Sequence, residues 1–100
     1  MATRGRATEY PHLARFLDGY YHQDFRVEHA SPAAAARAFV AKADDGHRLD
    51  VLREFRKLRE AMVGETPARW QRRLESVGGA WRPATLGAID EVIAVLGRAE

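Results

Sequence analysis

Residues 10–25, YPHLARFLDGYYHQDF, bring together several side chains that could serve catalysis or metal binding. His22 and Asp24 are the best candidates there for a metal site or for acid–base catalysis, because imidazole and carboxylate groups serve both purposes. His12 precedes them and His29 follows. Their separations match neither HExxH nor another ligand pattern of predictable geometry. We therefore expect no metal site and no cofactor.

The same side chains also suit the end of a helix. Asp24 can accept hydrogen bonds from backbone N–H groups of a turn, and His22 or Gln23 can cap the last carbonyls of the helix. A histidine at that position is favoured by the helix dipole as well. A structural role is thus the simpler interpretation of this cluster.

The rest of the chain offers little for catalysis. Ser31 and Ser76 stand at a predicted helix cap and a predicted helix end, not in the glycine-flanked turn that exposes a catalytic serine. The pair Gly78-Gly79 lacks the lysine and the spacing of a phosphate-binding loop. Cysteine is absent, which excludes disulfides, thiolate metal sites and cysteine nucleophiles. We therefore predict that the protein is not an enzyme.

Helices are the elements that must position these residues. An apolar stripe at 3–4 spacing behind Pro11 predicts a first helix over residues 11–21. Ser31 and Thr66 are each followed by a proline, a cap-then-proline signal that predicts the starts of the second and fourth helices. We expect the second helix to end near residues 44–46.

Two further helices complete the fold. A broad apolar face after Gly46 predicts the third helix, which should stop at Gly64 and is formed by Leu49, Val51, Leu52, Phe55, Leu58 and Met62. The fourth helix ends before Gly78-Gly79, and a fifth begins near Leu86. No segment shows the alternation of a strand, so the sequence predicts an all-α, single-domain bundle of about five helices. Residues 1–8 are expected to form a flexible arm before a helical domain of residues 9–100.

The N-terminus has no apolar run typical of a signal peptide, and no segment approaches the ~20 apolar residues of a membrane span. We therefore expect a cytoplasmic protein that does not contact membranes. Sixteen Lys and Arg residues nearly balance fourteen Asp and Glu residues, which indicates nucleic-acid binding only weakly. We also expect a monomer rather than an oligomer.

Aromatic and basic side chains each have two interpretations. Tyr20 and Tyr21 point about 100° apart on a helix, so one can pack in the core while the other reaches an interface. Trp70 is expected in the core. A nucleic-acid-binding regulator is the alternative function, although interleaved carboxylates favour an ordinary solvated face over this role. The basic residues it would use are Arg53, Arg56, Lys57, Arg69, Arg72 and Arg73.

Residues 10–25 as a whole closely resemble the N-terminal signature of a family of bacterial immunity proteins from contact-dependent growth inhibition systems. The matching positions are Tyr10, Pro11, Leu13, Phe16, Leu17, Tyr20, Tyr21, His22, Gln23, Asp24 and Phe25. After this segment only the layout of the family continues, with residues 78–83 as a divergent glycine–aromatic–proline turn. The resemblance implies a small helical cytoplasmic protein that binds and blocks the C-terminal domain of a toxin encoded beside it.

A contact surface for such a toxin follows as a hypothesis. The apolar signature residues fall on one stripe and should serve the fold, whereas His22, Gln23 and Asp24 either fix the helix corner or join the contact surface. We predict an acidic contact face, which would fit a basic toxin such as a nuclease. Its residues are Asp18, Tyr21, His22, Asp24, Glu28, Asp44 and Asp45.

Overall fold

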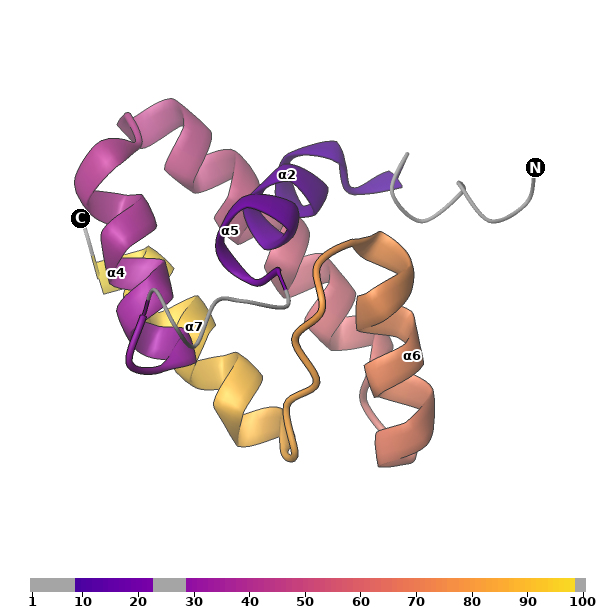
Figure 1. Cartoon of the computed structure of the whole chain (residues 1–100). Coiled ribbons are helices and arrows are strands. Elements are labelled where there is room, and N and C mark those ends of the chain that lie inside the picture. Colours follow the sequence, from indigo (N-terminus) through magenta and orange to yellow (C-terminus); the bar gives the residue numbers. More distant parts are fainter. Residues whose placement is uncertain (1–8, 23–28, 99–100) are drawn as a thin grey trace.

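The computed structural model describes residues 9–22 and 29–98, and five α-helices account for most of them. Helix labels follow Figure 1. No strand occurs within these two ranges, so the predicted all-α, single-domain fold is confirmed. The helices are α2 (Pro11–Tyr20), α4 (Pro32–Lys42), α5 (Asp45–Ala61), α6 (Pro67–Val77) and α7 (Leu86–Arg98).

Side-chain caps fix where three of the helices begin. Ser31, Asp44 and Thr66 each accept a hydrogen bond from the backbone N–H three residues further on, at 3.1, 2.7 and 3.4 Å. Proline occupies the first helical position behind Ser31 and Thr66, where its missing N–H costs nothing. Both predicted cap-then-proline starts are therefore confirmed.

The boundary between the second and third predicted helices was placed too late. Helix α4 ends at Lys42, and α5 already begins at Asp45, so Gly46 lies inside the first turn of α5 and does not separate two helices. The cap from Asp44 explains this start, because it satisfies an N–H group that would otherwise lack a partner. Gly64, with φ of +81°, does mark the turn that follows α5.

The core face of α5 also differs from the prediction at one position. Leu49 is 39% exposed, whereas Arg48 is almost completely buried. Arg48 precedes the buried Val51 and Leu52 by three and four residues and so shares their side of the helix. Its Nη1 donates to the carbonyl of Leu96 at 2.7 Å, which satisfies a carbonyl at the C-terminal end of α7.

One core joins all five helices. Tyr21, Phe16, Phe55, Leu58 and Met62 are among its largest fully buried side chains, and Trp70 is buried as predicted. Helix α2 packs on α5, and α7 packs between α4 and α5. Figure 1 shows α6 at the opposite side of the molecule from α4, and α6 contacts α2. Within the described residues, no helix is long and apolar enough to cross a membrane.

Candidate functional site

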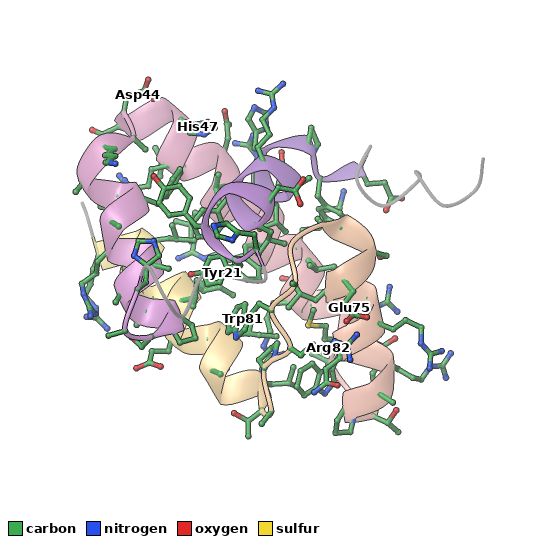
Figure 2. The ribbon with its side chains drawn as sticks, in the orientation of Figure 1. Tyr21, Asp44, His47, Glu75, Trp81 and Arg82 are labelled. Carbon is green, nitrogen blue, oxygen red and sulfur yellow. The ribbon has the colours of Figure 1, made fainter. Side chains whose placement is uncertain are left out.

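Tyr21 lies in the core and not on the surface. Its ring stacks on Trp81 with centroids 5.0 Å apart and meets Phe16 edge-on at 5.1 Å (Figure 2). Its hydroxyl donates to the carbonyl of Pro32 at 2.7 Å, and burial raises the pKa of this hydroxyl well above its ordinary value. The side chain has no exposed area, so Tyr21 belongs to the core, and its place in the contact face stays a prediction.

The neighbouring signature residues lie nearer the surface. Tyr20 is half-buried and stacks on His29 with centroids 6.0 Å apart, and its ring meets Phe39 edge-on at 5.6 Å. His22 is half-buried and is also held by interactions. The remaining predicted site and signature residues of this segment, Gln23, Asp24, Phe25 and Glu28, lie outside the described residues.

Asp18 connects the end of α2 to the turn between α6 and α7. Its Oδ1 accepts a hydrogen bond from the backbone N–H of Gly79 at 2.8 Å, although the side chain is exposed. Gly79 has φ of +72°, and a Cβ atom there would lie only 2.9 Å from the carbonyl oxygen of Leu17. The next residue, Ala80, donates its N–H to the carbonyl of Tyr21. The glycine turn is thus fitted closely against the signature helix.

The other two described acidic candidates stand at the start of α5. Asp44 is the helix cap, and Asp45 is largely exposed, with Oδ1 3.6 Å from Nη2 of Arg48. Figure 2 shows Asp44 at the top of the view and Trp81 near its centre. Asp18 is tied to the segment that carries Trp81, because it accepts a hydrogen bond from Gly79, two residues before Trp81. The described members of the predicted acidic face therefore come from two separate parts of the surface.

A carboxylate that the sequence analysis did not single out holds the start of the signature helix. Oε1 of Glu54, on α5, accepts from the backbone N–H groups of His12 and Leu13, both at 2.9 Å, and Oε2 lies 2.7 Å from Nδ1 of His12. Helix α2 has no side-chain cap of its own. Glu54 therefore supplies this cap from a different helix, and the negative charge also suits the N-terminal dipole.

His12 is the centre of a small polar cluster. Nε2 of His12 is 3.6 Å from Oδ2 of Asp50, and the rings of His12 and His47 have centroids 5.9 Å apart. Even so, the described residues contain no group of three or more His, Asp or Glu side chains arranged to hold a metal ion. His12 and Glu54 act together here as a cap that fixes α2 on α5.

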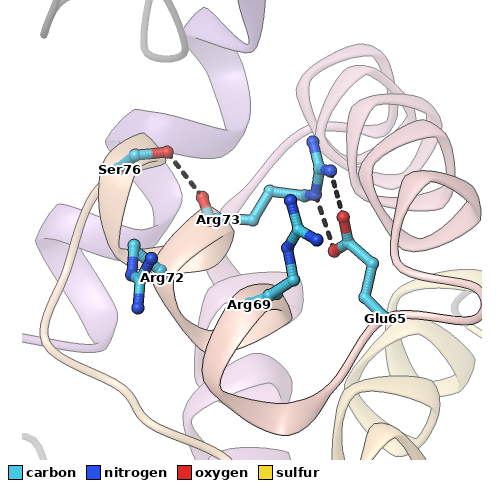
Figure 3. Close-up of a pocket in the computed structure, with 5 residues that line it drawn as sticks. All are labelled: Glu65, Arg69, Arg72, Arg73 and Ser76. Atoms are coloured by element: carbon cyan, nitrogen blue, oxygen red, sulfur yellow. Dashed lines mark hydrogen bonds and ion pairs between the residues drawn. The ribbon is translucent and has the colours of Figure 1, made fainter.

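The predicted basic residues divide between two grooves. Arg53, Arg56 and Lys57 line a groove of about 450 Å³ along α5. The three arginines of α6 line a second one of about 280 Å³ with Glu65 and Ser76 (Figure 3). Glu65 holds Arg73 through a two-point ion pair, and this hydrogen bonding raises the pKa of the Arg73 guanidinium. Arg69 and Arg72 have no ion pair within the described part of the chain.

Comparison with known proteins identifies the family. A family model described as CdiI immunity protein matches residues 9–89, which include the whole of the signature segment and most of the chain. No curated protein and no solved structure matches the chain. The chain therefore belongs to the CdiI immunity protein family, as the resemblance of residues 10–25 had indicated.

Proposed function

We propose that this CdiI family member binds the C-terminal toxin domain encoded beside it and neutralises that domain by forming an equimolar complex. The family match over residues 9–89 is the observation that carries this proposal. Inhibition of this kind requires a stable surface that covers or distorts the toxin, and it requires no chemistry from the immunity protein. We therefore propose that the protein acts by binding and not as an enzyme.

The packing of the signature segment supports a binding role. Its helix α2 is held at the N-terminal end by Glu54 and at the C-terminal end by Asp18 and the stacked Tyr21–Trp81 pair. A surface whose backbone is already fixed loses little conformational entropy on binding, which favours affinity. The described apolar members of the signature thus maintain the scaffold, and we place specificity for one toxin in exposed side chains outside that stripe.

The predicted acidic contact face remains a prediction, and the structure indicates how to test it. Asp18 and Asp44 accept backbone hydrogen bonds, so their replacement changes the fold as well as the surface charge. Asp45 is the better position, because its carboxylate is mostly exposed and, in the described part of the chain, makes only one distant ion pair. Asp45→Lys should weaken binding if this side of α5 contacts the toxin and should leave it unchanged if another surface does.

The experiment for the proposed function is co-purification of the protein with the adjacent toxin domain. Size-exclusion chromatography with light scattering should show an equimolar complex, and co-expression should restore growth of cells that produce the toxin domain. A toxin domain from an unrelated system serves as the control and should neither bind nor be neutralised. Absence of both binding and rescue with the adjacent domain would reject the proposal. A salt-sensitive complex with RNA or duplex DNA would instead favour the nucleic-acid alternative.

A further inference from the structure

Most of the carboxylates in residues 9–22 and 29–98 are occupied by internal contacts. Asp90 pairs with Arg59 at 2.8 Å, Asp50 with Arg53 at 2.7 Å, and Glu75 with Arg82. Glu54, Glu65, Asp18 and Asp44 are engaged as described above. Among the described residues, only the carboxylates of Glu60 and Glu91 make no such contact.

Several cations, in contrast, have no internal counter-charge. Within the described residues, these side chains form no ion pair, so the charge left over for a partner is mainly positive. They are found on α2, α4, α5, α6 and α7, and the full set is Arg15, Arg37, Lys42, Arg56, Lys57, Arg69, Arg72 and Arg98.

Two of these cations flank an apolar groove between α4 and α7. The groove has a volume of about 320 Å³ and is lined by Val40, Ala41 and Val95, together with Arg37 and Arg98. Ala41 and both arginines are exposed, and Val40 is half-buried. The groove therefore combines an apolar floor with two guanidinium groups that have no ion-pair partner in the described chain.

The groove along α5 lies next to the last turn of α7. A Cβ atom placed on Gly97 would be 3.6 Å from Nη2 of Arg56 and 3.9 Å from Cδ2 of Leu52, and both of these residues line the α5 groove. The following residue, Arg98, lines the α4–α7 groove. The α5 groove also contains Leu49, one of the two exposed large apolar side chains of the described residues. The two grooves thus flank one helix end.

We propose that this region, the α7-end surface, is where the protein contacts its toxin, and that it binds an acidic toxin surface with an apolar side chain at its centre. The α7-end surface consists of Arg37, Ala41, Leu49, Arg56, Lys57 and Arg98. This inference rests on the proposed function, because it names the chemistry of the toxin surface in the same complex. It differs from the sequence-based prediction of an acidic contact face.

The chemistry of the α7-end surface explains why we propose an acidic protein surface as its partner. Interfaces concentrate their binding energy in an apolar centre that excludes water, and arginine is enriched among the residues that contribute most. A guanidinium group pairs with a carboxylate through two parallel hydrogen bonds, and this pairing strengthens as water is excluded. An acidic protein surface supplies both the carboxylates and an apolar side chain, whereas a phosphate backbone supplies no group for the apolar floor.

The α6 groove in Figure 3 provides the contrast. Arg69 and Arg72 also have no ion pair there, but the groove is lined by four charged side chains and Ser76 and has no apolar floor. Arg73 in that groove is already held by Glu65. Both the α6 groove and the α7-end surface therefore carry cations without an ion pair among the described residues. The apolar floor is the feature that distinguishes the α7-end surface. The α6 groove supplies a matched control with the same change of charge.

The test compares two double reversals against the adjacent toxin domain. Arg37→Glu with Arg98→Glu should raise the Kd about 100-fold or more, because each reversal places like charges together at the interface. Arg69→Glu with Arg72→Glu changes the net charge equally and should alter the Kd by no more than about threefold. Binding is measured by titration calorimetry at about 0.1 M salt. Circular dichroism and the Tm establish that each variant is folded.

Two gentler variants keep the proposal testable if the first reversal fails to fold. Arg37→Gln with Arg98→Gln removes both charges and should raise the Kd about tenfold, whereas Arg69→Gln with Arg72→Gln should not. Ala41→Glu places a carboxylate on the exposed floor of the groove. It should raise the Kd at least as much as Arg37→Gln with Arg98→Gln does. Ala68→Glu, at an exposed position of α6, is its control and should bind normally.

Each outcome decides the proposal. Loss of affinity confined to the α7-end variants supports it. Equal loss in both double reversals would show general attraction by net charge and would overturn the assignment of the surface, as would normal binding by both. In these two cases the wild-type complex still forms, so the proposed function stands. If the wild-type protein binds no toxin domain, both proposals fail. Binding of RNA or duplex DNA through Arg37 and Arg98 would overturn the proposal that the partner at this surface is a protein.

Discussion

Glu54 stabilises a helix other than its own, and its removal tests how the signature helix is held. Two backbone N–H groups in the first turn of α2 and the ring of His12 all depend on this one carboxylate. The Glu54 side chain is only 12% exposed. Glu54→Ala leaves the two N–H donors without an acceptor and leaves a gap where the carboxylate packed. The variant should therefore be clearly less stable than the wild-type protein.

The size of the loss follows from the contacts. Removing a helix cap costs about 0.5–2 kcal/mol, and leaving a donor without its charged acceptor costs about 1.5–3 kcal/mol when water cannot replace it. His12 is half-buried, so water replaces part of what is lost. We therefore expect the free energy of unfolding to fall by about 2–4 kcal/mol for Glu54→Ala. For a domain of this size the Tm should fall on the order of 10–25 °C.

Urea unfolding followed by circular dichroism measures this free energy, and Glu60→Ala is the matched control. Glu60 is on the same helix, but its carboxylate is exposed and makes no internal contact in the described structure, so its loss should change stability by less than about 0.5 kcal/mol. Glu54→Gln keeps one acceptor oxygen, and its free energy of unfolding should lie between those of Glu54→Ala and Glu60→Ala. The reasoning is refuted if Glu54→Ala is no less stable than Glu60→Ala.

Two further predictions concern the corner where the signature helix ends. Burial raises the pKa of Tyr21 from its ordinary value of 10.0, so the folded state keeps this proton when the unfolded state releases it. The stability contributed by Tyr21 is therefore complete below about pH 10 and falls as the pH rises further, by at most about 1.4 kcal/mol per pH unit. In urea titrations above about pH 10, Tyr21→Phe should lose less free energy of unfolding than the wild-type protein, whereas Tyr20→Phe should lose as much. Gly79→Ala should lower the free energy of unfolding by about 2–4 kcal/mol, because its φ is positive and its Cβ would strike the backbone of α2. Gly64→Ala has the same sign of φ but open space, and its cost should be only about 1 kcal/mol.

Clear results would contradict each of these two predictions. An identical loss of stability above about pH 10 in Tyr21→Phe and in the wild-type protein would show that the Tyr21 hydroxyl is not the buried group that titrates. Equal costs for Gly79→Ala and Gly64→Ala in thermal unfolding would show that the glycine turn does not pack closely on α2.

The sequence predicted the helices well where the signal is local. The starts at Ser31 and Thr66 depend on a side chain and a backbone N–H only three residues apart, and both were placed correctly. The same local pattern was less informative at residues 44–46, where a glycine suggested a break but the cap at Asp44 had already started the next helix. A glycine in the first turn costs a helix little compared with the gain from a cap.

Contacts between distant elements could not be predicted from spacing. Glu54 is 42 residues from the backbone it caps, and Asp18 is 61 residues from Gly79, so no window of sequence contains both partners. The sequence also could not decide which of two adjacent tyrosines is buried. Tyr20 and Tyr21 both extend the apolar stripe, and only packing against Trp81 makes Tyr21 the buried one.

Which charged residues share a surface could be predicted even less well, because this depends on tertiary structure. An acidic face was inferred from charges that are close in sequence, but folding assigns Asp18 and Asp44 to backbone contacts in separate places. Arg37 and Arg98 are far apart in sequence and come together only because α4 packs on α7. The resemblance of residues 10–25 predicted the family correctly, and the family model matches residues 9–89.

The measurement that tests the central claim most directly is a titration of toxin activity with the purified protein. The toxin domain is held at a concentration well above the Kd, and its activity is assayed after each addition. If the protein neutralises its toxin by forming an equimolar complex, activity should fall linearly and vanish at one equivalent. Undiminished activity at several equivalents would contradict the account, and so would complete inactivation by a small fraction of an equivalent, because that result requires turnover instead of binding.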